Sequence, residues 1–147
     1  MRKVGSLLSL ISMLNCSNLD YTPGGIAVNK NGYHPNMDMI DVKYDAVEHC
    51  LRENEIPILN GKEDIVVYIE TDQEDIIPCP NKEYDVCQGY YCLAFCEEIG
   101  RIGIPENLRY LSHELSHHLR RSEVHDTITK TCGTSLDYKI NPTYLPE

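Results

Sequence analysis

The sequence predicts a small α+β domain, on the basis of three observations. Apolar residues recur at steps of three and four over residues 39–53, which is the spacing of one buried face of a helix. Two runs rich in β-branched residues, 65–69 and 98–104, have the length and composition of strands. A second helical pattern follows, with leucines at positions 108, 111, 115 and 119. A chain of 147 residues is long enough for one domain with a substantial core.

The predicted elements have recognisable boundaries. Asp38 or Asp41 can cap or charge the start of the first helix. Residues 77–96, between the two strands, form a loop rich in cysteine and proline. Pro105 suits the first turn of the second helix, and we expect only a short tail after that helix.

The N-terminus has the pattern of a secretory signal peptide. Arg2 and Lys3 precede an apolar run over residues 4–14, which is too short to span a membrane. A cysteine at the end of this run, Cys16, resembles the lipidated first residue of a mature bacterial lipoprotein. We therefore expect residues 1–15 to be a lipoprotein-type signal peptide and the protein to be exported to the bacterial cell envelope, anchored through Cys16.

The mature chain is predicted to begin with a tether. Residues 16–37 are rich in Asn, Gly, Pro and Ser and show no periodicity, which indicates an irregular lead-in. The domain proper would then be residues 38–147. The net charge is −10, and it becomes −12 when Arg2 and Lys3 leave with the signal peptide. Such an acidic chain, without a basic patch, is unsuited to nucleic acid, so we expect no nucleic acid partner and membrane contact only through the lipid anchor.

The cysteine content agrees with an oxidising compartment. The chain has seven cysteines, and lipidation of Cys16 would leave six that can form three disulfides. A structural zinc site on the four cysteines of the loop is a weaker alternative, because their spacings contain no C-x2-C pair. The six disulfide candidates are Cys50, Cys79, Cys87, Cys92, Cys96 and Cys132.

Four of the six histidines fall within residues 113–125, and two of them form the motif His113-Glu114-Leu115-Ser116-His117. Residues four apart lie above one another on a helix face, so the two imidazoles can bind one zinc ion. The glutamate between them is then placed to take a proton from a zinc-bound water.

This HExxH segment resembles the active-site helix of the zincin metallopeptidases, in which a helix and a small sheet precede the motif. The resemblance implies a zincin-like domain that binds Zn²⁺ through His113 and His117 and uses Glu114 as general base. It also implies hydrolysis of a peptide or protein substrate. We expect the protein to act as a monomer.

The third zinc ligand is not defined by the motif, because the glycine that turns the chain in HExxHxxGxxH zincins is replaced by Arg120. We favour His125, since imidazole is a common zinc ligand. Glu123 is an alternative, and either residue requires the helix to break near Ser122 and the chain to fold back. Asp137 is a further alternative, because residues 133–138 faintly resemble the GTxD motif of the aspzincin branch.

Several other residues have weaker claims to a role. Tyr138 or Tyr144 can supply a hydrogen bond to the oxyanion formed during hydrolysis. His118 points about 100° away from His117, so a surface or supporting position is expected rather than a zinc ligand. His34 and His49 are expected to be structural or solvated.

A second class of function competes with the peptidase. The domain is short, and it can instead be a non-catalytic exported domain that binds zinc or is stapled by disulfides into an interaction module. Glu114 favours chemistry, because a domain that merely holds zinc has no need of a carboxylate at that position.

Overall fold

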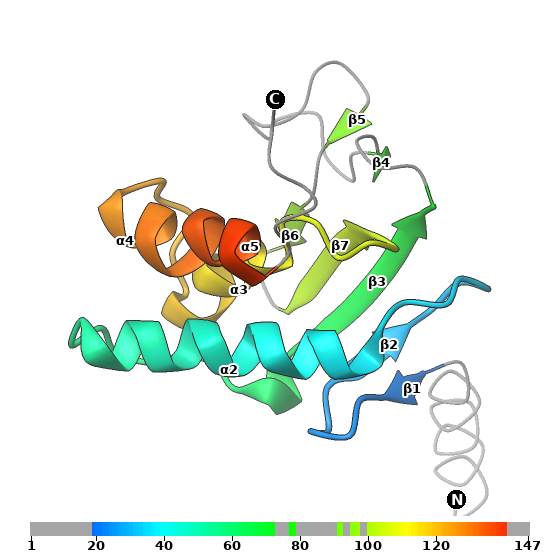
Figure 1. The fold of residues 1–147 in the computed structure, drawn as a ribbon, viewed down its shortest axis with the longest axis horizontal. Coiled ribbons are helices and arrows are strands. Elements are labelled where there is room, and N and C mark those ends of the chain that lie inside the picture. The colour runs from blue at the N-terminus through cyan, green and yellow to red at the C-terminus, as the bar shows by residue number, and fades with distance from the viewer. Residues whose placement is uncertain (1–18, 73–76, 79–90, 93–94, 98–99, 141–147) are drawn as a thin grey trace, which may run out of the picture.

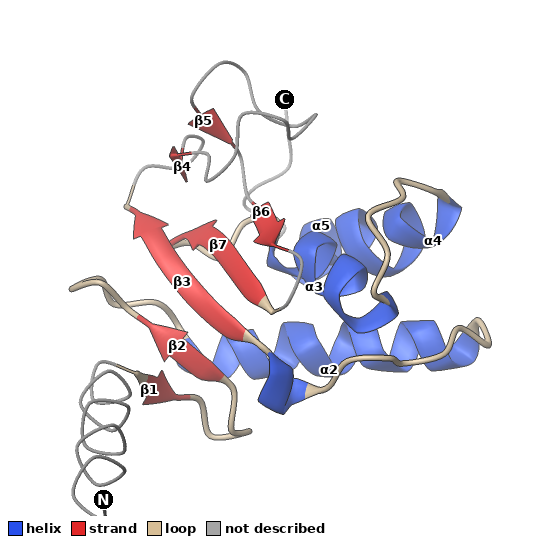
Figure 2. Ribbon diagram, turned by 180° about the vertical axis from the view of Figure 1, so that it is seen from behind, coloured by secondary structure: helices blue, strands red, loops and turns tan. Residues whose placement is uncertain are grey.

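The computed structural model describes residues 19–72, 77–78, 91–92, 95–97 and 100–140. It confirms the α+β class: helices pack on one face of a mixed sheet (Figure 1). Figure 2, seen from behind, shows the strands in front of the helices. The core lies between these two layers, where Val47 and Leu51 of the first helix and Ile69 and Ile104 of the sheet are fully buried.

The main sheet has five strands in the order β1-β2-β3-β7-β6. The central strands β2, β3 and β7 are parallel, and the edge strands β1 and β6 are antiparallel to their neighbours. Two further short strands, β4 and β5, pair with each other. The bounds are β1 Asp20–Tyr21, β2 Ala27–Asn29, β3 Val66–Thr71, β4 Ile77–Pro78, β5 Tyr91–Cys92, β6 Phe95–Glu97 and β7 Arg101–Pro105.

The prediction that residues 16–37 form an irregular tether is wrong for residues 20–29, which belong to the sheet, while residues 30–36 are irregular as expected. Residues from Asp20 onward contribute β1 and β2, and β2 lies inside the sheet beside β3. Ile26 and Val28 have no exposed surface, so this strand is part of the core. The apolar run is only three residues long and is preceded by Pro and Gly, and so short a strand leaves no periodicity in the sequence.

The first helix, α2, spans Met37–Glu53 and matches the predicted range closely. Asn36, rather than Asp38 or Asp41, caps it by accepting a hydrogen bond from the backbone N–H of Met39 at 3.1 Å. Asp41 instead binds the Thr22 hydroxyl and the Gly24 N–H. A short 3₁₀ turn, η1 Lys62–Asp64, connects α2 to β3.

The histidine-bearing helix begins later than predicted. Pro105 is the last residue of β7 rather than the first of a helix, and α3 spans Leu111–Arg120. The intervening turn places Leu108 and Tyr110 at φ values of 63° and 66°, a left-handed conformation that no helix can contain. Leu108 is buried as expected, but it belongs to this turn and not to the helix.

The chain after α3 is not the short tail that was predicted, because it forms further helical segments. α4 Thr127–Thr129, the π-helical turn η2 Lys130–Thr134 and α5 Ser135–Ile140 run on continuously and pack against α3 and α2. A disulfide between Cys50 of α2 and Cys132 of η2 joins these elements.

The other predicted features lie wholly or partly outside the described residues. The signal peptide, Cys16, Cys79, Cys87 and Tyr144 are not among them, and the side chains of Cys92 and Cys96 are not described. The Cys50–Cys132 disulfide is observed, and the other two predicted disulfides stay a prediction. Within the described ranges, no helix combines the length and apolar character needed to cross a membrane.

Candidate metal centre

Helix α3 presents two histidines on one face because they are separated by four residues. Its opposite side carries Leu111, Leu115 and Leu119, which are fully buried in the core. The apolar stripe therefore fixes the rotation of the helix, and with it the direction in which His113 and His117 point.

The chain reverses directly after α3, in agreement with the predicted break near Ser122. Arg121 adopts a left-handed conformation with φ of 56° and donates its N–H to the carbonyl of His118. Ser122 donates its N–H to the carbonyl of His117 at 3.1 Å. Two backbone bonds thus satisfy the last carbonyls of the helix and end it without the glycine that usually occupies this position.

The returning loop is held by a bidentate ion pair. Arg120 donates two hydrogen bonds to the carboxylate of Asp126, at 2.9 and 2.7 Å, and a third to the Thr129 hydroxyl. Asp126 also caps α4 by accepting the Thr129 N–H. These bonds close the loop over residues 121–126 and bring His125 back to the helix.

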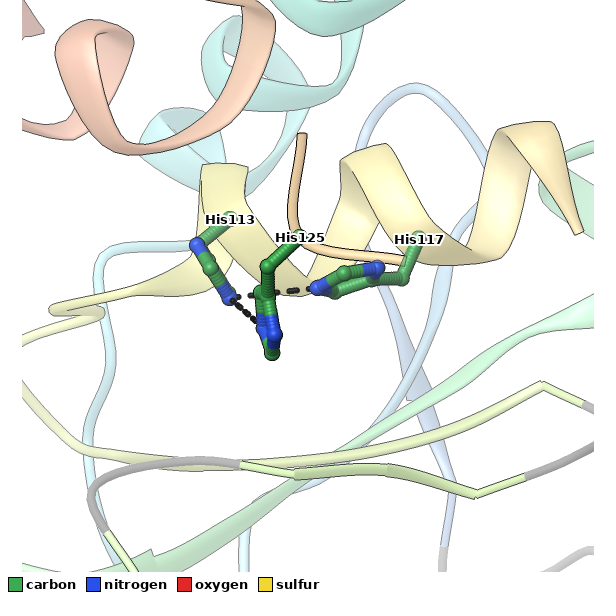
Figure 3. Close-up of side chains that lie close together, drawn as sticks. All are labelled: His113, His117 and His125. Carbon is green, nitrogen blue, oxygen red and sulfur yellow. Dashed lines mark hydrogen bonds between the residues drawn. The ribbon is translucent and has the colours of Figure 1, made fainter. Parts of the chain in front are cut away.

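The three histidines converge on one point. The Nε2 atom of His113 lies 3.2 Å from Nε2 of His117 and 3.2 Å from Nε2 of His125. Figure 3 shows the imidazoles turned towards one another, two from α3 and one from the loop. A tetrahedral zinc ion with bonds of about 2.1 Å needs ligand nitrogens roughly 3.4 Å apart. The spacing of His113 from the other two histidines therefore fits a zinc ion.

In two of the rings, the contact made by the outer nitrogen, Nδ1, bears on whether the inner nitrogen, Nε2, holds a proton or a lone pair. The Nδ1–H of His117 donates to the carbonyl of Ser122 at 2.7 Å, because that oxygen can only accept. The neutral ring then has a lone pair on Nε2. Nδ1 of His113 lies 3.0 Å from the Thr134 hydroxyl, which can accept from an Nδ1–H or donate to a bare Nδ1. When Nδ1 carries the proton, the lone pair on Nε2 of His113 faces that of His117, and a cation between them removes their repulsion.

Burial favours the neutral form of two of these imidazoles, His113 and His117. Burial, with the neighbouring rings of His117 and His125, lowers the pKa of His113 to about 4. Burial also lowers the pKa of His117, against the opposing effect of its bond to Ser122. Since only the neutral imidazole ligates a metal, both effects favour binding at neutral pH.

Glu114 lies beside the three histidines and is buried. One carboxylate oxygen, Oε1, is 4.0 Å from Nε2 of His113. Burial raises the pKa of Glu114 to about 8, and the negative charge of Asp137 adds to this rise. The Glu114 carboxyl can therefore act as an acid or a base near neutral pH. A cation bound by the histidines would favour its ionised form.

The remaining candidates lie elsewhere. Glu123 is exposed and is not part of the histidine cluster. Asp137 is buried, but its carboxylate binds Lys43 and the first turn of α3 rather than the cluster. Tyr138 is half-buried on α5.

The other histidines do not join the cluster. His118 is buried, and its Nε2 lies 3.3 Å from the carbonyl of Gly61. His49 is exposed and pairs with Glu53 at 3.1 Å. The backbone N–H of His34 donates to Glu106.

Sequence reasoning missed several supporting residues. Thr134 and Arg120 gave no signal, because their roles depend on segments that meet only in the fold. Lys43 did leave a signal: it falls on the otherwise apolar face of α2 between Ile40 and Val47, where a buried charge requires a partner.

Comparison with protein-family models, curated proteins and solved structures finds no match.

Proposed function

We propose that this chain is an exported zinc metallopeptidase of the zincin type. One observation carries the proposal: three imidazole nitrogens face a common point beside the buried carboxyl of Glu114. A helix and strands precede the histidine-bearing helix, as in the family that the motif resembles. A peptide or protein is the expected substrate, and a monomer the expected state.

His113, His117 and His125 would hold the metal. Three protein ligands leave one of four positions open, which is typical of catalytic rather than structural zinc sites. Zinc bound there would polarise a peptide carbonyl and lower the pKa of a water molecule towards about 7. Thr134 and the Ser122 carbonyl orient two of the rings through their outer nitrogens.

Glu114 would move the proton. Its Oε1 atom would accept a proton from the attacking water and later give it to the leaving amine nitrogen. Its raised pKa is that of the carboxyl without a cation nearby. A positive charge at the three histidines favours the ionised carboxylate, which is the form that a base requires.

The same carboxyl supports a second candidate, a zinc-binding domain without turnover. Burial and Asp137 raise the pKa of Glu114 to about 8, so the metal-free site holds a protonated carboxyl at neutral pH. A carboxyl that stayed protonated with zinc bound could not act as a base. The two candidates differ in hydrolysis and agree in zinc binding.

The decisive experiment measures zinc content and peptide hydrolysis in the same preparations. We expect about one zinc ion per wild-type chain, retained in Glu114→Gln and lost in His117→Ala. Hydrolysis of a peptide library should fall by about 10²–10⁴-fold in Glu114→Gln. His49→Ala, which changes an exposed histidine of α2, is the matched control and should leave both quantities unchanged.

Three outcomes separate the candidates. Zinc without hydrolysis in the wild type favours the non-catalytic domain. Wild-type activity in Glu114→Gln would exclude the proposed base. No zinc in folded wild-type protein that was never exposed to a chelator would overturn both candidates and favour a disulfide-stapled interaction module.

Export and lipidation form a separate part of the proposal. The signal-like N-terminus and the Cys50–Cys132 disulfide support an oxidising destination in the cell envelope. We expect the mature protein made in bacteria to start at Cys16 and to partition with membranes, and Cys16→Ser to abolish this. Intact-mass measurement checks it, and an unprocessed N-terminus would contradict it.

A further inference from the structure

A buried ion pair lies behind the candidate metal centre, on the far side of the first turn of α3. Lys43 Nζ and Asp137 Oδ1 are 2.6 Å apart, and their side chains are 0% and 6% exposed. Lys43 comes from α2 and Asp137 from α5. Since a buried ion pair seldom adds net stability over apolar residues of the same size, its presence invites a more specific explanation.

Asp137 caps α3 from a distance. Its Oδ1 accepts the N–H of Ser112 at 3.0 Å and its Oδ2 accepts the N–H of His113 at 3.1 Å. The residue at the usual capping position, Tyr110, is left-handed and makes no side-chain cap. The free N–H groups of this helix end are therefore satisfied by a carboxylate 25 residues later in the chain.

Lys43 holds the same carboxylate and the turn that leads into the helix. Besides Asp137, its ammonium group donates to the carbonyl of Leu108 at 3.2 Å. The turn over residues 106–110 and the first turn of α3 are thus tied to one buried cation. The charge of Asp137 is compensated where it meets the helix.

The segment that carries Asp137 also holds the ring of His113. Thr134, three residues earlier, contacts Nδ1 of His113, while Asp137 binds the backbone N–H of the same residue. One segment therefore fixes both the backbone and the imidazole of His113. Glu114 follows directly, so its position depends on the same contacts.

We infer that Lys43 and Asp137 are positioning residues for the metal centre: together they set the height and rotation of the first turn of α3, and so the places of His113 and Glu114. This inference rests on the proposed function and assigns a role to residues outside the HExxH motif. It also gives the Gly133–Asp137 segment a task other than metal ligation.

The test compares zinc affinity in two helix-cap variants of the mature chain. Asp137→Asn keeps the shape but supplies one carbonyl oxygen where two carboxylate oxygens served, and we expect the zinc Kd to rise about 10–100-fold. Asn36→Ala removes the cap of α2, which is remote from the site, and should lower Tm without changing the Kd. Competition with a chromophoric chelator measures both.

A double variant tests the same inference if Asp137→Asn alone does not fold. Lys43→Met with Asp137→Asn removes both charges at once, so no unpaired cation stays buried. We expect this double variant to fold and to bind zinc at least about tenfold more weakly than the wild type. Amide hydrogen exchange in metal-free protein should show faster exchange at Ser112 and His113 in either variant.

The outcomes are distinguishable. Wild-type zinc affinity in a folded variant would overturn the positioning role and leave the proposed function standing. A loss of affinity in Asn36→Ala equal to that in Asp137→Asn would also overturn it, because stability alone would then explain the effect. A wild-type chain that binds no zinc would overturn the proposed function itself.

Discussion

At the scale of single residues, the atoms behind the imidazoles matter as much as the imidazoles. The Ser122 carbonyl accepts from Nδ1 of His117, which leaves a lone pair on Nε2, and the Thr134 hydroxyl can accept from Nδ1 of His113 in the same way. The other tautomer would carry its proton on Nε2 and could not bind a metal through that atom. The zinc affinity that we propose for the site would therefore depend on groups that never touch the ion.

Thr134 offers a direct test of this dependence. Thr134→Val keeps the shape but removes the hydroxyl, and we expect zinc affinity to fall by about tenfold or more. Thr134→Ser keeps the hydroxyl and should retain most of the affinity. Nitrogen chemical shifts of His113 in the metal-free protein report the tautomer, and an unchanged tautomer in Thr134→Val would contradict the assignment.

Residue spacing predicted the helical part of this site, and residue type suggested the remaining candidate ligand. His113, Glu114 and His117 could be found from the motif alone, because a helix fixes their geometry. His125 was favoured for its chemistry, but its approach depends on the left-handed Arg121 and the Arg120–Asp126 pair. No local pattern specifies such a loop, since its bonds are made between groups that meet only after the chain reverses.

At the scale of elements, the contact between α3 and η2 requires a glycine. A Cβ atom at Gly133 would lie 2.9 Å from Cα of His113 and 2.9 Å from Oγ of Ser116. The two helical segments are closer here than any side chain allows. This close approach is what places Thr134 within reach of the His113 ring.

We expect Gly133→Ala to push η2 away from α3. The free energy of unfolding should fall by about 1–3 kcal/mol, which is typical of overpacking a core contact. Zinc affinity should fall with it. Thr131→Ala changes an exposed residue of the same turn and should alter stability by less than about 0.5 kcal/mol. Urea unfolding measures both, and equal effects of the two variants would contradict this account.

The sequence predicted long elements better than short ones. The apolar face of α2 is long enough to show its period, and the helix was found at nearly its observed bounds, although the buried Lys43 on that face was missed. β2 and the helical segments after residue 126 are short, and tertiary contacts hold them in place. Pro105 illustrates the opposite error, because a proline that can open a helix also fits the end of a strand.

At the scale of the whole molecule, one covalent bond joins distant parts of the chain. The Cys50–Cys132 disulfide closes a loop over a sequence separation of 82 residues. A cross-link of this span restricts the unfolded chain strongly, and the chain-entropy relation gives about 4.5 kcal/mol. The fold is thus coupled to the redox state of its surroundings.

Reduction of this bond should destabilise the domain. We expect a Cys50→Ala/Cys132→Ala variant to lose about 2–5 kcal/mol of unfolding free energy relative to the oxidised wild type. Chemical denaturation with and without reductant measures the effect. The variant should not respond to reductant at this bond, and a wild type that is equally stable in both conditions would exclude the disulfide.

Tyr44 should make the folding stability of the molecule fall at high pH. Burial and the nearby carboxylates of Glu48 and Glu63 raise the pKa of Tyr44 to about 12. Between pH 10 and 12 the unfolded chain loses the phenolic proton while the folded chain keeps it, so the unfolded state gains stability. The folded state should lose up to about 2.7 kcal/mol over this range.

The matched variant for this prediction is Tyr44→Phe, which retains the buried ring. Its stability should fall less steeply than that of the wild type between pH 10 and 12. The difference between the two urea-unfolding series isolates Tyr44 from the lysines that titrate in the same range. Parallel pH profiles would contradict the raised pKa.

The late position of Cys132 in the chain determines when the disulfide can form during synthesis. A chain that emerges from a ribosome or a secretion channel with its N-terminus first presents Cys50 early and Cys132 only after all three histidines have passed. The disulfide, the Thr134 hydroxyl and the Asp137 cap therefore become available only after the HExxH motif has emerged. A nascent chain exposes His113 and Glu114 before the groups that hold them in place in the folded domain.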